Sequence, residues 1–209
     1  MYVITGGAGF IGSNVVQALE ARGAGPLVVC DRLRDGDKWR NIAKRTLRDI
    51  VHPDHIREFL DAEGHAVKGI VHMGAISATT ETDADLIVEN NFRLSRDLWV
   101  WCAEHDVPYI YASSAATYGD GAEGFDDDIS ADGLNKLRPL NPYGWSKLLF
   151  DKWVAAELAA DRARPTQWAG LRFFNVYGPN EYHKGRMMSV VAQIQPVAAK
   201  REACRLFQS

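Results

Sequence analysis

A tyrosine and a lysine stand four residues apart, Tyr143 and Lys147, at the start of a long amphipathic segment that follows Pro142. This spacing places both side chains on one face of a helix. A tyrosine is a poor base at neutral pH, but a nearby ammonium group favours the phenolate and lowers the pKa of the phenol. The pair could therefore take a proton from an alcohol. Surface side chains are the alternative, and that role is common for this spacing alone.

Two serines, Ser113 and Ser114, end an apolar segment upstream of this tyrosine. The hydroxyl of Ser114 could hydrogen-bond the oxygen of the reacting alcohol, and Lys147 could also hold a nucleotide ribose. Capping a helix or a strand end is the alternative role for Ser114. Tyr143, Lys147 and Ser114 are therefore candidate catalytic residues.

A glycine-rich turn, GGAGFIG at residues 6–12, follows the first apolar segment and opens the first amphipathic one. Glycine permits a tight turn, a close approach of backbone N–H groups to a pyrophosphate, and close packing of helix on strand. The helix N-terminus adds unpaired N–H donors and a partial positive charge. The strand, turn and helix order predicts a dinucleotide site at Gly6, Gly9 and Gly12.

The residues after the second apolar segment bear on which dinucleotide binds. Asp31 lies close to the spacing of about 20 residues expected for the acid that binds the ribose, and it favours NAD. The basic residues Arg32, Arg34 and Lys38 follow at once, and their charges would hold the 2′-phosphate of NADP. Three basic residues favour NADP, with NAD as the alternative.

The elements that must position these residues alternate along the chain. Apolar, β-branched runs without polar alternation are typical of strands that helices cover on both faces. This pattern predicts an α/β doubly wound parallel sheet, the Rossmann fold, with right-handed crossovers. The predicted strands are Tyr2–Thr5, Leu27–Asp31, Gly69–Met73, Tyr109–Ser113 and Trp168–Phe173, with a very short one at Leu47–Asp49; the predicted helices are Phe10–Arg22, Pro53–Glu63, Asp83–His105 and Pro142–Ala160.

After Arg172 the sequence predicts a loop, a helix at Arg186–Ala199 and a strand-like Cys204–Phe207. A second layer that has only begun cannot bury its apolar side well. We therefore expect a nucleotide-binding Rossmann domain at residues 1–172 and an incomplete C-terminal substrate domain at residues 173–209.

The composition limits the class of protein. Among 209 residues, 46% are hydrophobic and 24% charged, with a net charge of −3, which is ordinary for a globular protein and argues against nucleic-acid or membrane partners. No apolar stretch approaches the roughly 18 residues of a membrane span, and the start of the chain has no signal-peptide pattern. Three scattered cysteines favour a reducing cytoplasmic location. The acidic run Asp126–Asp128 lacks partners with metal-ligand spacing, so we expect a solvated loop and no metal.

These residues together resemble the extended branch of the short-chain dehydrogenase/reductase superfamily, the sugar-nucleotide epimerases and dehydratases. Dehydratases of this branch carry an adjacent Asp-Glu pair after the serine. The segment Ser113–Gly119 has no such pair, so the resemblance favours redox epimerisation.

Four blocks resemble more closely the ADP-L-glycero-D-manno-heptose 6-epimerases of lipopolysaccharide core synthesis, and the likeness covers residues 1 to about 207. They are Asp31–Trp39, Gly74–Glu81, Tyr111–Gly119 and Phe173–Gly185. Within the last block, His183-Lys184-Gly185 discriminates best, because sugar 4-epimerases generally lack it. The resemblance implies NADP-dependent interconversion of ADP-D-glycero- and ADP-L-glycero-D-manno-heptose through a ketone, on a small-molecule nucleotide-sugar substrate.

The resemblance also implies site residues. Tyr143 and Lys184 would be the two acid/base residues, since inversion through a ketone uses one proton-handling group for each substrate orientation. The implied cofactor-binding residues are Phe10, Ile11, Asp31, Arg32, Lys38, Met73, Gly74, Ala75, Ile76, Ser77, Asn90, Lys147 and Val176, and the implied substrate contacts are Ser114, Asn175, Arg186 and Phe207.

The chain departs from that family at three positions. Arg186 stands where a small serine is usual, Pro53 near a basic position, and Gln193 where a histidine is expected. The family also continues beyond residue 209, with an arginine and a tyrosine that bind the nucleotide sugar. Two alternatives remain, a UDP-hexose 4-epimerase and a truncated, non-catalytic dinucleotide-binding remnant. By analogy of fold alone, a homo-oligomer is expected.

Overall fold

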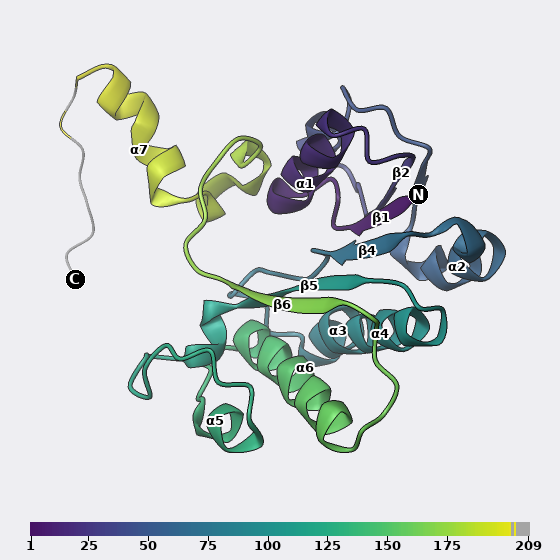
Figure 1. Ribbon diagram of the computed structural model, residues 1–209. Helices are drawn as coiled ribbons and strands as arrows, with labels where there is room; N and C mark the ends of the chain where they lie inside the picture. The colour runs from purple at the N-terminus through teal and green to yellow at the C-terminus, as the bar shows by residue number, and fades with distance from the viewer. Residues whose placement is uncertain (202, 204–209) are drawn as a thin grey trace.

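The computed structural model describes residues 1–201 and 203, which form a six-stranded parallel sheet with the order β3-β2-β1-β4-β5-β6 (Figure 1). In this order a crevice opens between the loops after β1 and β4, where the direction of winding reverses. The predicted doubly wound Rossmann fold is confirmed. The strands are β1 (Tyr2–Thr5), β2 (Leu27–Cys30), β3 (Asp49–Val51), β4 (Gly69–His72), β5 (Tyr109–Ser114) and β6 (Trp168–Phe173).

Seven α-helices connect or follow these strands in the described residues, with short 3₁₀ turns between them. The α-helices are α1 (Phe10–Ala21), α2 (Ile56–Glu63), α3 (Ala84–Ile87), α4 (Leu94–Glu104), α5 (Ala131–Lys136), α6 (Pro142–Ala159) and α7 (Val190–Ala199). The 3₁₀ turns are η1 (Asp37–Asn41), η2 (Pro53–His55), η3 (Gly64–Ala66), η5 (Ala115–Tyr118) and η6 (Tyr182–Met187), and one π-helical turn, η4 (Val88–Arg93), joins α3 to α4. That turn lies inside the single helix predicted for Asp83–His105.

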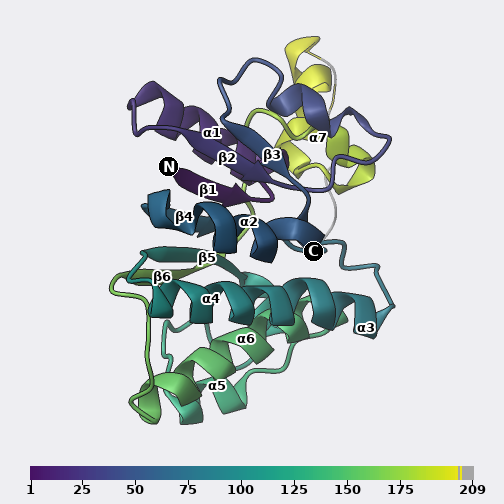
Figure 2. The ribbon, with the colours of Figure 1, turned by 90° about the vertical axis from the view of Figure 1, so that its right-hand side faces the viewer.

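The helices cover the two faces of the sheet unequally (Figure 2). Helices α2, α4 and α6 bury a large aromatic core on one face, with Trp99 and Trp101 fully enclosed. On the other face, α1 and the end of η1 cover β1, β2 and Val71 of β4, around Ile4 and Val29. The expectation of helices on both faces therefore holds for half of the sheet, and Leu171 of β6 is 42% exposed.

Some predicted boundaries differ from the structure. The short third strand begins at Asp49 rather than Leu47, because Val51 is the side chain that joins the core. The sequence analysis missed α5, which follows the acidic run Asp126–Asp128. Ser130 caps this helix by accepting from the N–H of Gly133. The last helix begins only after Ser189, its N-cap. The strand-like Cys204–Phe207 lies outside the described residues.

The segment after β6 crosses the carboxyl ends of the strands and reaches the start of α1 (Figure 1). There the side chain of Asn14 donates to the carbonyl of Pro179, and Asn180 donates to the hydroxyl of Ser13, both at 3.0 Å. Helix α7 follows and buries none of its residues. No helix in the described part of the chain has the length and apolar character needed to cross a membrane.

Candidate active site

The turn between β1 and α1 is built so tightly that side chains are excluded from it. Gly6 has a φ of +63°, and a Cβ there would meet the backbone of Gly74 at 2.7 Å. A Cβ on Gly12 would lie 2.2 Å from the carbonyl oxygen of Gly6. The N-cap of α1, Gly9, has no side chain to occupy the first N–H groups of the helix. This cradle, with donors at a helix N-terminus, fits the pyrophosphate of a dinucleotide.

Asp31, at the end of β2, is anchored to the glycine turn. One oxygen of its carboxylate accepts from the backbone N–H of Ala8 at 2.9 Å, and the other accepts from the ammonium of Lys38 at 2.6 Å. The side chain of Asp31 is 8% exposed. Asp31 and Lys38 thus meet beside the turn, as a ribose-binding pair would. Arg34, the third basic residue of this loop, is exposed.

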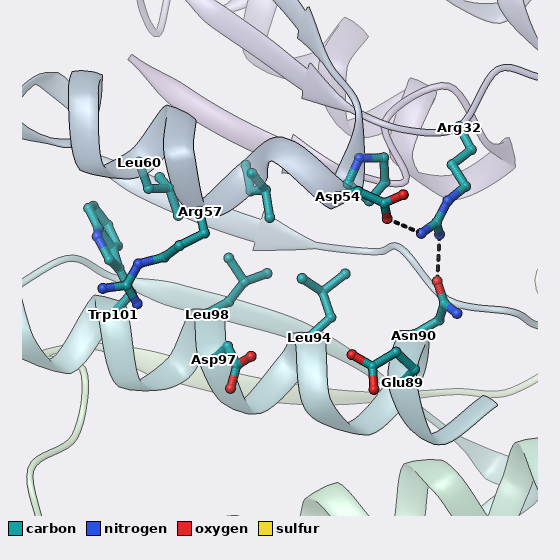
Figure 3. Close-up of a pocket in the computed structure, with 12 residues that line it drawn as sticks. Arg32, Asp54, Arg57, Leu60, Glu89, Asn90, Leu94, Asp97, Leu98 and Trp101 are labelled. Carbon is teal, nitrogen blue, oxygen red and sulfur yellow. Dashed lines mark hydrogen bonds and ion pairs between the residues drawn. The ribbon is translucent and has the colours of Figure 1, made fainter. Parts of the chain in front are cut away.

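Arg32 lies at the mouth of a cleft of about 340 Å³ between α2 and α4 (Figure 3). Its guanidinium donates to the side-chain oxygen of Asn90 and to the carboxylate of Asp54. The apolar floor of the cleft runs from there past Leu98 to Trp101. Two predicted cofactor residues, Arg32 and Asn90, are thereby brought into contact across the end of the sheet.

The loop after β4, which carries Met73 to Ser77, is held by an asparagine that the sequence analysis missed. The buried Asn91 accepts from the N–H of Ile76 at 2.8 Å and donates to its carbonyl at 3.0 Å. The same amide donates to the hydroxyl of Ser146 on α6 at 3.0 Å. Asn91 lies in the π-helical turn, and such turns are frequent at functional sites. It fixes the predicted cofactor loop against the helix of Tyr143 and Lys147.

Helix α6 begins at Pro142, and this start places Tyr143 in its first turn, near Ser114. Asn141 caps the helix by accepting from the N–H of Gly144 at 2.8 Å, with Pro142 in the first turn. A Cβ at Gly144 would lie 2.6 Å from the carbonyl oxygen of Ala116, so only glycine permits this approach. This approach brings the phenol of Tyr143 near enough to the side chain of Ser114 for that hydroxyl to lower the pKa of the phenol.

Ser114 has the capping role that the sequence offered as the alternative. Its hydroxyl oxygen accepts from the N–H of Ala116 at 3.1 Å and so caps the 3₁₀ turn η5. The same hydroxyl lies near enough to Tyr143 to lower the pKa of its phenol. A hydroxyl has two acceptor lone pairs and one proton, so the cap leaves Ser114 able to bind a further oxygen.

Two effects on the pKa of the Tyr143 phenol oppose one another. Burial raises the pKa of Tyr143, and the nearby hydroxyl of Ser114 lowers it by less. Burial also lowers the pKa of Lys147 to about 8, which the carboxylate of Asp151 partly offsets. The expectation that Lys147 would bring the phenol toward neutral pH is therefore not met by the chain's own groups. The phenolate needs a further positive charge beside it.

Asp151 ties this helix to two strands. It lies one helical turn after Lys147, and its carboxylate accepts from the hydroxyl of Ser113 at 2.8 Å. The guanidinium of Arg172, at the end of β6, lies 3.3 Å from the same carboxylate oxygen. The pairing keeps Lys147 and the Ser114 end of β5 in fixed relation.

Lys184 lies on the other side of the crevice, in a loop organised by a buried carboxylate. Glu181 accepts from the backbone N–H groups of Gly178 at 2.8 Å and Ser189 at 2.6 Å. The ammonium of Lys184 lies 5.5 Å from the centre of the Phe10 ring, at the glycine turn. No hydrogen bond joins Lys184 to Tyr143.

The predicted substrate residues Asn175 and Arg186 and the predicted cofactor residue Val176 are all exposed. Phe207 lies outside the described residues. The structure thus gathers Tyr143 with Ser114 and places Asp31, Lys38 and Lys184 around the glycine turn.

A buried chain of polar groups supports both halves of the site. His72, at the end of β4, lies 2.6 Å from the hydroxyl of Thr5 and 2.8 Å from that of Ser95. Ser95 donates to the carbonyl of Asn91, and Thr5 accepts from the N–H of Gly74. Ser95 gives its proton to Asn91, so Nε2 of His72 donates to Ser95. Burial lowers the pKa of His72 and keeps the ring neutral, so Nδ1 accepts from the hydroxyl of Thr5.

The comparisons with known proteins agree with this geometry. The sequence model described as the NAD dependent epimerase/dehydratase family matches residues 2–209. The chain belongs to this family. Two curated relatives, from Fusobacterium nucleatum and Nitratidesulfovibrio vulgaris, are each 48% identical over the whole chain and are both named ADP-L-glycero-D-manno-heptose-6-epimerase. The chain spans 62% and 63% of their lengths.

Solved structures of the epimerase family superpose on the chain. The ADP-L-glycero-D-manno-heptose-6-epimerase of Helicobacter pylori has a TM-score of 0.75 at 27% identity, over 95% of this chain and 62% of that one. A UDP-glucose 4-epimerase from Brucella ovis, solved with NAD, has a TM-score of 0.70 at 26% identity, over 96% of this chain and 61% of that one.

The buried histidine of this epimerase-family chain makes stability depend on pH. Burial, aided by Lys147, lowers the pKa of His72 from 6.5 to about 3. Between these values the unfolded chain holds one more proton than the folded chain, so the free energy of unfolding falls as the pH falls. From pH 6.5 to 5 the loss is about 2 kcal/mol.

A His72→Gln variant is expected to be less stable at pH 7.5 but to lack that extra loss. Urea unfolding at pH 7.5 and pH 5 measures it, with the exposed His65→Gln as the control that keeps the full loss. An identical pH dependence in His72→Gln and the wild type would show that His72 is not the titrating group.

Proposed function

We propose that this chain carries the nucleotide-binding and proton-transfer residues of an ADP-L-glycero-D-manno-heptose 6-epimerase that uses NADP. The observation that carries the proposal is the proximity of Tyr143 to Ser114, with Lys147 buried one turn later on the same helix. This group lies at the carboxyl ends of the parallel strands, where ligands of open α/β sheets bind. The choice of an ADP-heptose is supported by the two relatives that are 48% identical.

The residues around the glycine turn would hold the cofactor. The N-terminus of α1 would bind the pyrophosphate, and Asp31 and Lys38 would lie at the adenosine ribose. Lys147 would bind the nicotinamide ribose, and Asn90 with the loop after β4 would line the crevice. The bound nicotinamide supplies a hydride acceptor and a positive charge. The basic residues Lys38 and Arg32 favour NADP over NAD.

Tyr143 would take the proton of the sugar hydroxyl as the carbinol is oxidised. Its hydroxyl already lies near Ser114, and Ser114 would hydrogen-bond the substrate oxygen in the same place. Lys147, protonated below a pKa of about 8, would stabilise the phenolate together with the positive charge of the bound nicotinamide. The balance of the step is simple: the alcohol loses a hydride and a proton and becomes a ketone.

Inversion requires that the ketone present its other face before the hydride returns. In that second orientation a different group must supply the proton, and we propose Lys184, which faces the crevice from the Phe10 side. The segment from residue 173 onward would then contribute to substrate binding. Asn175, Val176 and Arg186 are the residues of this segment that we propose near the sugar.

A Lys184→Met variant is expected to lose about a hundredfold or more in turnover, the usual contribution of one proton-transferring group. The dissociation constant of NADP, measured by calorimetry, should change little, because methionine keeps the packing on Phe10. Lys200→Met, at the exposed end of α7, is the matched control. An unchanged turnover in Lys184→Met would remove Lys184 from the mechanism.

One experiment separates the proposed function from its alternatives. The purified chain is assayed for bound nicotinamide dinucleotide and for turnover of ADP-D-glycero-D-manno-heptose and UDP-galactose. Bound NADP with turnover of the ADP-heptose supports the proposal. Turnover of UDP-galactose instead identifies a 4-epimerase, and cofactor without any turnover identifies a binding part that needs the rest of a longer chain.

A further inference from the structure

Arg32 is held in place by two partners at the mouth of the cleft between α2 and α4 (Figure 3). Asn90 accepts one N–H of the guanidinium, and its own amide is fixed because it donates to the carbonyl of Leu86 at 2.8 Å. The carboxylate of Asp54 accepts from the other nitrogen. Both bonds use the forked end of the guanidinium, which is the part that binds phosphate groups bidentately.

The second cation of this site, Lys38, is also paired with an aspartate, but that aspartate is buried and belongs to the core of the site. Lys38 pairs with Asp31, which is nearly buried and also accepts from Ala8 of the glycine turn. Asp31 is therefore part of the architecture of the turn. The side chain of Asp54 is 62% exposed, and in the described part of the chain its carboxylate contacts only Arg32 and His52. It can be changed without disturbing the core.

A carboxylate in this position opposes a 2′-phosphate twice. It occupies the guanidinium that the phosphate would use, and its negative charge repels the phosphate. A free 2′-hydroxyl suffers neither effect, because it carries no charge and does not need Arg32. Asp54 would therefore weaken the binding of NADP and leave the binding of NAD nearly unchanged.

We propose that Asp54 sets the cofactor preference of this chain by competing with the 2′-phosphate of NADP for Arg32. The inference rests on the proposed function only in requiring that the glycine turn binds a nicotinamide dinucleotide. Asp54 is thus a specificity-determining residue that acts through Arg32, and it retains NAD as a usable cofactor beside the basic residues that favour NADP.

The test compares the dissociation constants of NADP and NAD by calorimetry in the wild type and in Asp54→Asn. The amide keeps the size of the side chain and removes its charge. The affinity for NADP should rise about five- to tenfold, the effect of removing one exposed ion pair and one like-charge contact, while that for NAD changes less than about twofold. Asp61→Asn is the matched control, because Asp61 is an exposed carboxylate of α2 that pairs with Arg57 instead.

A second pair of variants shows whether the effect passes through Arg32. In an Arg32→Met background only the repulsion remains, so Asp54→Asn should raise the affinity for NADP by no more than about twofold. A gain there as large as in the chain with Arg32 shows simple charge repulsion and overturns the competition, and an unchanged ratio of NADP to NAD affinity in Asp54→Asn overturns the whole inference. If the wild type binds neither dinucleotide, the proposed function fails first, which is a distinct outcome.

Discussion

Tyr143→Phe is expected to reduce turnover of ADP-D-glycero-D-manno-heptose at least about a thousandfold, because it removes the group that takes the proton in the first step. Phenylalanine keeps the ring and its burial at the start of α6. The contact of the phenol with Ser114 is lost, but Ser114 still caps the turn η5. Steady-state assays and NADP titrations of the same preparations measure the effect, and NADP affinity should stay within about threefold of the wild type.

The matched control is Tyr2→Phe, which makes the same chemical change at the start of β1, far along the strand from the crevice. It should leave turnover unchanged. Turnover of Tyr143→Phe equal to that of the control would mean that another group takes the proton, and the assignment of α6 as the catalytic helix would be wrong.

Gly12→Ala is expected to abolish dinucleotide binding and to lower the stability of the fold. A Cβ at this position would lie 2.2 Å from the carbonyl oxygen of Gly6 and 2.9 Å from the Cα of Gly7. Both neighbours are backbone atoms of the turn, so relief requires α1 to move away from β1. We expect a loss of at least about a hundredfold in NADP affinity and of about 2 kcal/mol or more in the free energy of unfolding.

Gly36→Ala is the control for this variant, because a Cβ at Gly36 meets no atom within 4 Å and its φ is −91°. Calorimetry with NADP and urea unfolding should both give values near those of the wild type. Wild-type affinity for NADP in Gly12→Ala would contradict the binding of the pyrophosphate at this turn.

The fold was predictable from sequence because its signals are local. Each long predicted strand is a continuous apolar run, and each long predicted helix has an amphipathic pattern. The glycine turn follows β1 directly. The predictions were wrong where tertiary contacts determine the secondary structure. The short β3 is placed by the burial of Val51, and the acidic loop hides α5, whose Leu134 packs against Leu148 of α6.

The chemical groups of the candidate site were predictable from the sequence, but the residues that hold these groups in position were not. Tyr143, Lys147 and Ser114 have types and spacings that indicate proton transfer. Asn91 and Asp151 act only through contacts across the fold, so their spacing carries no chemistry. One signal for Asn91 was present, since a buried asparagine inside a helical pattern competes with the helix backbone and needs a structural reason.

We propose that the glycine turn binds NADP with the nicotinamide beside Tyr143, and a crystal structure of the chain with NADP would show this. We expect the pyrophosphate at the N-terminus of α1 and the nicotinamide in contact with the Tyr143 phenol. A dinucleotide bound elsewhere, or a nicotinamide separated from that phenol by packed side chains, would contradict it.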